Sequence, residues 1–198
     1  MKIKVLSILF VCSLFFALPL RAQEQTSIVR FEQEYKSNMK TGMLVLGGWA
    51  ALNMLGGTAL SLNNSGENKY FHQGNALWNV VNLGIAVAGY LNTGLSDSLA
   101  TSPTEMIAEY QSLQRFLLFN AGLDIAYIAT GMYLREKSLS SEKKDMLAGY
   151  GSALLLQGGF LLLFDTVLYF VNMHNETITL QPYLNEKLGT GISLLIKM

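Results

Sequence analysis

The chain lacks most of the features on which soluble enzymes rely. Its single cysteine, Cys12, lies in an N-terminal apolar segment, so a protein that loses this segment has no thiol for redox, disulfide or metal chemistry. It contains no glycine-rich phosphate loop, no GxSxG or HExxH motif and no polar segment long enough for a soluble catalytic domain. We therefore assign no catalytic residue and no cofactor, and an enzyme would have to work within the apolar segments.

Charged residues are also scarce, at 14% of the chain against 51% hydrophobic residues. They lie almost wholly between long apolar stretches, and the formal net charge is zero. This composition is too apolar for a small soluble protein, and the lack of net charge gives no reason to expect nucleic acid. The lipid bilayer is the expected partner, and a second copy of the chain or another membrane protein is the further partner that the layout allows.

Four apolar stretches are each long enough to cross about 30 Å of hydrocarbon. Ser102, Pro103 and Glu105 carry the pattern of a helix start before the third stretch. A short, turn-rich connection at 63–71 predicts that the first two helices form an antiparallel hairpin. The expected fold is an all-α membrane protein, an antiparallel four-helix transmembrane bundle over 42–174. Its spans are 42–62, 74–92, 116–134 and 147–172.

The first 22 residues have the pattern of a secretory signal peptide. Lys2 and Lys4 precede an apolar core of about 13 residues, and Ala22 is a small residue suited to cleavage. The alternative is an uncleaved extra span, for which the core is shorter than the roughly 20 residues needed. We expect residues 1–22 to be removed.

Two further segments flank the predicted bundle. In the polar segment 23–41, Ile28, Phe31 and Tyr35 recur at helical spacing, which predicts a short amphipathic pre-helix at the membrane interface. The tail 175–198 alternates polar and apolar residues from Thr177 and predicts a small β-hairpin outside the membrane. The rival interpretation, a strand of an outer-membrane barrel, conflicts with the helical pattern before it.

The signal and the loop charges predict the orientation. The signal places the mature N-terminus outside the cytoplasm. The loop 135–146 carries four basic residues, as cytoplasmic loops of membrane proteins do. With four spans, both mature termini are then periplasmic, and the protein is a multi-pass protein of the inner (cytoplasmic) membrane.

The spans contain a few polar residues at helical spacing and no Lys or Arg. Because hydrocarbon cannot satisfy polar groups, these residues are expected to face the bundle interior. His72 and His174 have no second ligand at metal-binding spacing, so no metal site is assigned. The candidate binding residues are Asn53, Asn79, Asn82, Asn120, Asp124, Gln157 and Asp165.

The two aspartates are the least easily explained of these residues. At about 1.5 Å per residue, Asp124 shares a level near the bilayer midplane with Asn53, Asn82 and Gln157. Asp165 falls at a second level, with Asn120 and Trp49. Without a nearby cation, Asp124 is expected to hold a proton and to donate to one of the amides at its own level. Such a group suits proton or cation transfer and suits a hydrogen-bonded core equally well.

The layout resembles an uncharacterised family of small bacterial four-span membrane proteins. The resemblance covers about residues 40–175 and is carried by WAALNMLGG, FHQGNALWNVVNLG, NAGLDIAYIATGMYL and LLLQGGFLLLFD. It implies the fold and the membrane location, and it brings no activity and no site residues.

Three functional classes follow from the sequence. The first is a structural or interaction bundle, a scaffold whose polar residues are packing contacts. The second is a small transporter or proton-linked carrier that uses Asp124 and Asp165. The third is a lipid- or quinone-binding membrane enzyme or binder. A packed seam without a cavity favours the scaffold, a water-filled cavity at Asp124 favours the carrier, and an apolar slot opening sideways between helices favours the lipid binder.

Overall fold

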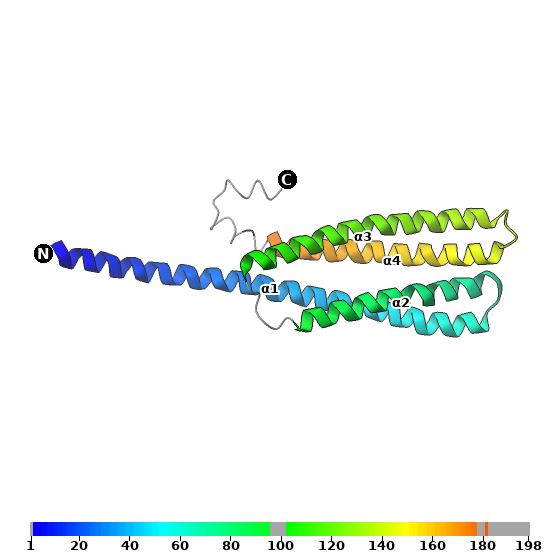
Figure 1. Cartoon of the computed structure of the whole chain (residues 1–198), viewed down its shortest axis with the longest axis horizontal. Helices are drawn as coiled ribbons and strands as arrows, with labels where there is room; N and C mark the ends of the chain where they lie inside the picture. The colour runs from blue at the N-terminus through cyan, green and yellow to red at the C-terminus, as the bar shows by residue number, and fades with distance from the viewer. Residues whose placement is uncertain (1, 96–101, 178–180, 182–198) are drawn as a thin grey trace. The chain divides into compact units, whose positions relative to one another are not determined.

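The computed structural model describes the backbone of residues 2–95, 102–177 and 181, and the side chains of 28–93, 102, 104–177 and 181. This part of the chain is made of long α-helices (Figure 1), and the predicted all-α class is confirmed. Each predicted span lies within one of them. The helices are α1 (Lys2–Asn63), α2 (Gly66–Leu95), α3 (Pro103–Ser138) and α4 (Lys144–Asn175).

The two predicted flanking elements differ from the structure. The segment 23–41 is helical, but it is a continuous part of α1 rather than a separate pre-helix. Its apolar face is buried in the protein, with Phe31 fully covered, so packing rather than a membrane surface covers that face.

The predicted C-terminal hairpin is not supported. No strand occurs among the described residues, although most of 175–198 lies outside them. Thr177, where the alternation begins, lies in a helical turn, and its hydroxyl donates to the Met173 carbonyl at 3.0 Å. The sequence has no glycine or proline between Gly159 and Pro182, so no helix-breaking residue ends α4 at the predicted boundary.

The chain divides into two compact units. The described parts of Met1–Tyr35 and Met173–Met198 form the first unit. Within it, the rings of Phe31 and Tyr35 stack, with centroids 6.3 Å apart. The second unit, Lys36–Asn172, is called the bundle unit below, and it holds all the candidate site residues.

The bundle unit consists of two antiparallel hairpins, α1 with α2 and α3 with α4, whose turns lie at the same end of the bundle (Figure 1). Only residues 64 and 65 separate α1 from α2. Gly66 follows with φ of +60°, a left-handed conformation that costs glycine little because it has no Cβ. The predicted start of α3 is confirmed, since the Glu105 backbone N–H donates to the Ser102 hydroxyl at 3.2 Å.

Glycines allow α4 to approach its neighbours closely. A Cβ at Gly151 would lie 2.8 Å from the Gly131 carbonyl oxygen of α3, and a Cβ at Gly158 would lie 3.0 Å from the Asp124 carbonyl oxygen. A Cβ at Gly74 of α2 would lie 2.8 Å from the Ala153 Cβ of α4. Lipid gives helices no hydrophobic reason to associate, so close contacts of this kind hold membrane helices together.

The bundle unit buries polar side chains among apolar ones and exposes many large apolar side chains. Its largest fully buried side chains are those of Gln157, Asn79 and Asn172, whereas many large apolar side chains are exposed, such as Leu52 at 73% and Val81 at 64%. A soluble protein shows the opposite arrangement. Three helices are long and apolar enough to cross a membrane among the described residues, Ile28–Asn63, Thr104–Ser138 and Lys144–Asn175.

The helix α2 falls outside that set, although it has 30 residues. Its five asparagines lower its hydropathy, and three of them, Asn75, Asn79 and Asn82, are buried in the bundle unit. The length and position of α2 therefore agree with the predicted span 74–92, while its composition alone does not identify it as a span.

The glycine contacts give a matched pair of substitutions. We expect Gly158→Ala to lower the free energy of unfolding by about 1 to 3 kcal/mol, because its Cβ would press on the backbone of α3. Gly159→Ala is the control, since a Cβ there meets nothing within 4 Å. Thermal unfolding in detergent measures both, and equal stability of the two variants would contradict the close α3–α4 packing.

Candidate functional site

Gln157 joins three helices at the centre of the bundle unit. Its side chain is fully buried, its carbonyl oxygen accepts from the Trp49 indole N–H of α1 at 3.0 Å, and its amide donates to Asn75 of α2 at 2.7 Å. The Trp49 ring also stacks on Phe160 of α4, with centroids 4.0 Å apart. These contacts make Gln157 a structural link between α1, α2 and α4.

The remaining predicted amides make mostly local contacts. Asn79 is fully buried and donates to the Asn75 carbonyl one turn earlier at 2.8 Å, and Asn82 donates to the Asn79 side chain at 3.1 Å. Asn53 is half-buried and donates to the Trp49 carbonyl of its own helix at 2.9 Å. Asn79 and Asn82 therefore extend the polar stripe along α2, whereas Asn53 makes a bond only within α1.

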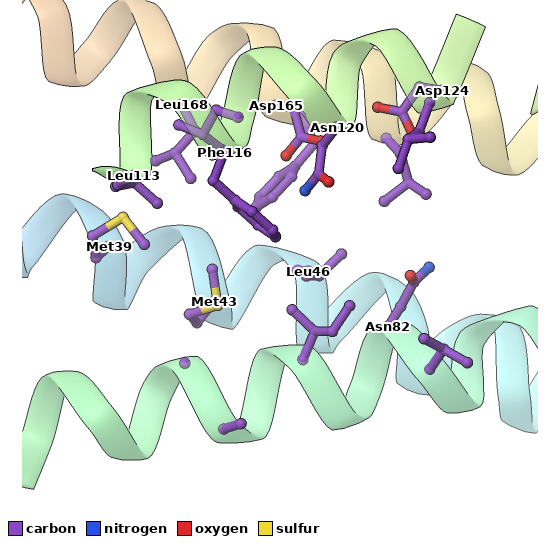
Figure 2. A pocket seen from close by; sticks show the side chains of 18 of the residues that line it. Met39, Met43, Leu46, Asn82, Leu113, Phe116, Asn120, Asp124, Asp165 and Leu168 are labelled. Carbon is purple, nitrogen blue, oxygen red and sulfur yellow. The ribbon is translucent and has the colours of Figure 1, made fainter. Parts of the chain in front are cut away.

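A cavity of about 800 Å³ lies between α2 and α3, with α1 and α4 forming its floor (Figure 2). Met39, Met43 and Leu46 line it from α1, and most other lining side chains are apolar or aromatic. Its rim includes Val81 and Phe116, which are 64% and 53% exposed, so the cavity opens sideways between the two helices. It is the apolar lateral slot that distinguishes the lipid-binder class.

Polar side chains gather on one wall of this cavity. Asp124 and Asn120 come from α3 and Asp165 from α4, while Asn82 approaches from α2 (Figure 2). The carboxyl groups of Asp124 and Asp165 lie within hydrogen-bonding reach of each other. Two carboxyl groups in one cavity without a cation favour holding one proton over carrying two negative charges.

Asp124 has a further unused acceptor. Its side chain is 3% exposed, and its Oδ2 atom has no hydrogen-bond partner in the described part of the chain. A buried carboxyl oxygen without a partner is costly, which distinguishes Asp124 from the hydrogen-bonded amides Gln157, Asn79 and Asn82.

The predicted two-level arrangement differs from the structure in the partner of Trp49, whereas Asp165 lies near Asn120 as predicted (Figure 2). Asp124 contacts Asp165 rather than an amide of its own level, and Trp49 bonds to Gln157 rather than lying beside Asp165. Depth along a helix places a residue only to within about a turn.

The seven predicted residues thus fall into two groups. Asn82, Asn120, Asp124 and Asp165 line the cavity, while Asn53, Asn79 and Gln157 do not. Sequence reasoning missed Asn92, although it continues the three- and four-residue spacing of the α2 stripe, and missed Met39, which lies in the segment read as an interfacial pre-helix.

A comparison with protein families matches residues 45–166 to a family of unknown function (DUF6992). This match covers more than half of the chain and includes both cavity carboxyls. The resemblance to an uncharacterised family is thereby confirmed. No curated protein and no solved structure matches the chain.

The contacts of Gln157 lead to a direct test of its structural role. Gln157→Leu removes the partners of Trp49 and Asn75 and leaves buried polar groups unsatisfied, so we expect a loss of about 1 to 3 kcal/mol in unfolding free energy. Asn53→Leu is the control, because its amide bonds only to a carbonyl of its own helix. Chemical denaturation of the two purified variants measures the difference. A loss for Asn53→Leu as large as for Gln157→Leu would contradict the assignment.

Proposed function

The chain belongs to the DUF6992 family, and we propose that it is a membrane protein that binds a lipid-soluble, amphiphilic molecule in the cavity between α2 and α3. The polar end of this molecule lies at Asp124 and Asp165, and its apolar body lies along the methionine and aromatic lining.

The shape and lining of the cavity carry this proposal. Its volume of about 800 Å³ lies within the range of small-molecule sites, roughly 300 to 1,000 Å³. Apolar walls with a few polar groups at one place are the usual arrangement of a site that orients a largely apolar ligand. The exposed rim at Val81 and Phe116 lets a molecule enter from the hydrocarbon without passing through water.

The same geometry favours binding over a scaffold. A scaffold needs its helices joined along their length, and the Gln157 contacts do join α1, α2 and α4. Beyond them, α2 and α3 meet through the edge-to-face contact of Trp78 with Tyr127, at 4.8 Å, and the cavity extends from there. Packing alone gives no reason for a polar pair to line that space.

A proton-linked carrier is the second candidate. The observation in its favour is the Asp124–Asp165 contact in the wall of the cavity, because a shared proton there can be exchanged with a ligand. Carriage across the membrane would further require the cavity to open toward both aqueous sides.

We propose that α2 crosses the membrane together with the other three helices. We also propose that the membrane is the bacterial inner membrane and that residues 1–22 are removed. The exposed face of α2 supports a membrane span there, since its apolar residues Leu77, Val80 and Val87 are each at least half exposed. The turn ends carry the basic residues of 135–146, and Arg135 pairs there with Glu67 of α2 at 3.7 Å. Both mature termini are then periplasmic.

Reporter fusions test this orientation. Alkaline phosphatase, which is active only in the periplasm, is fused after Leu139 in the α3–α4 turn or after Met198. We expect activity only after Met198, and the mature protein should begin at Gln23. Activity after Leu139 alone would reverse the orientation.

Filling the cavity tests the binding function. We expect Ala88→Phe, which adds a ring at the open side of the cavity, to lower the amount of co-purified amphiphile by at least about tenfold, because the ring obstructs the space that the ligand enters and occupies. Val87→Phe is the matched control, because Val87 is the neighbouring residue, is 50% exposed and does not line the cavity.

Mass spectrometry of organic extracts from the purified variants makes the measurement. Thermal unfolding is recorded in parallel, so that loss of ligand is separated from loss of fold. Equal amounts of every extracted molecule in wild type and Ala88→Phe would contradict binding in this cavity.

A further inference from the structure

The walls of the cavity carry acidic groups and no basic ones. Among the described lining residues, the titratable groups are Asp124, Asp165 and Tyr127, and none is Lys, Arg or His. The lining residues from α1 are Met39, Met43 and Leu46, and all three are apolar. On α2, Trp78, Asn82 and Asn92 are the polar or aromatic side chains, and all three are neutral. The carboxyl pair therefore faces no cation from any of the four helices that surround it.

The pair can hold one proton and one negative charge. Asp124 and Asp165 line one cavity that has no cation in its walls, and two negative charges there would repel each other, so one carboxyl group holds a proton and the other carries the charge. An isolated negative charge is unfavourable in a low-dielectric cavity. Asp124 lines this cavity, is 3% exposed, and its Oδ2 atom has no hydrogen-bond partner in the described part of the chain.

From this charge balance we propose that the ligand is a lipid-soluble cation, such as an amphiphilic amine, whose positive group lies against the Asp124–Asp165 pair and balances its negative charge. The inference rests on the proposed binding function and names the ligand class of the same site. A positive group supplies the counter-charge that the four helices lack, and the ligand brings the apolar body that the remaining walls require.

The aromatic lining fits a cation as well. Trp78, Tyr127 and Phe116 line the same cavity as the carboxyls, and aromatic ring faces attract positive charge. A phospholipid is disfavoured, because its phosphate would bring a second negative charge toward the pair. A neutral quinone-like head can accept the shared proton's hydrogen bond, but it leaves the negative charge uncompensated.

Protonation of the carboxyl pair sets the sign of the pH dependence of cation binding. As the pH falls, the pair takes up a second proton and loses its negative charge, so a cation should bind more weakly. As the pH rises, the pair is deprotonated and a cation should bind more tightly. Tyr127 is the other titratable group on the walls, and Tyr127→Phe retains its ring while removing its hydroxyl.

Three probes of one shape and different charge test the proposal. Tetraphenylphosphonium is cationic, tetraphenylsilane is neutral and tetraphenylborate is anionic. Each is equilibrated by dialysis against the purified full chain in maltoside micelles, with empty micelles as the blank. We expect one tetraphenylphosphonium per chain, bound at least about tenfold more tightly than either other probe, and weakened at least about tenfold between about pH 8 and about pH 5.

Variants assign the effect to the carboxyl pair. Asp124→Asn and Asp165→Asn keep the side-chain shape and should each weaken tetraphenylphosphonium at least about tenfold and remove most of its pH dependence. Val87→Phe, at a residue that does not line the cavity, should leave both the affinity and its pH dependence unchanged. If an Asn variant does not fold, the pH dependence of tetraphenylphosphonium binding to the wild type still tests whether a titrating acidic group binds the cation.

The outcomes separate this inference from the proposed function. Equal binding of the neutral and cationic probes, with both lost in Ala88→Phe, would overturn the charge inference and leave amphiphile binding intact. Tetraphenylphosphonium binding that ignores both Asn substitutions or the pH would also overturn it. Binding of no probe, together with no co-purified amphiphile, would overturn both.

Discussion

Polar side chains inside the bundle unit must find partners within the protein, because hydrocarbon offers them none. Gln157 meets this constraint by accepting from Trp49 of α1 and donating to Asn75 of α2. Each such bond contributes about 0.6 kcal/mol on average in a membrane, so the bonds define which faces meet more than they add stability. The glycines of α4 then let the backbones approach to the distance that these short side chains need.

The cavity follows from the same constraint. α4 packs closely on α3 at Gly151 and Gly158, and α2 packs on α4 at Gly74. α2 and α3 meet through the Trp78–Tyr127 contact and through the Arg135–Glu67 pair at the turn end, and toward the other end they leave space between them. The carboxyl pair lines this space rather than the packed centre, which separates the residues that hold the fold from those that face a ligand.

Much of the fold could be predicted, because apolar length and helical spacing are local properties of the sequence. The start of α3 at Ser102 and the buried α2 stripe through Asn79 are of this kind. Contacts between helices depend on their rotation and register, which spacing leaves open. For this reason the pairing of Asp124 with Asp165, and of Trp49 with Gln157, could not be derived. The start of the tail shows the opposite error, since its alternation resembled a strand, whereas Thr177 lies in a helical turn.

Fluorescence quenching of Trp78 tests most directly whether the cavity opens to lipid. Trp78 lines the cavity, and Trp49→Phe leaves it as the only tryptophan of the chain. In bilayers, phospholipids with brominated acyl chains quench an indole in contact with hydrocarbon, and iodide quenches one in contact with water. The account predicts strong quenching by the brominated chains and little by iodide. Quenching by iodide with none by the brominated chains would show a water-facing cavity and contradict a lateral site for a lipid-soluble ligand.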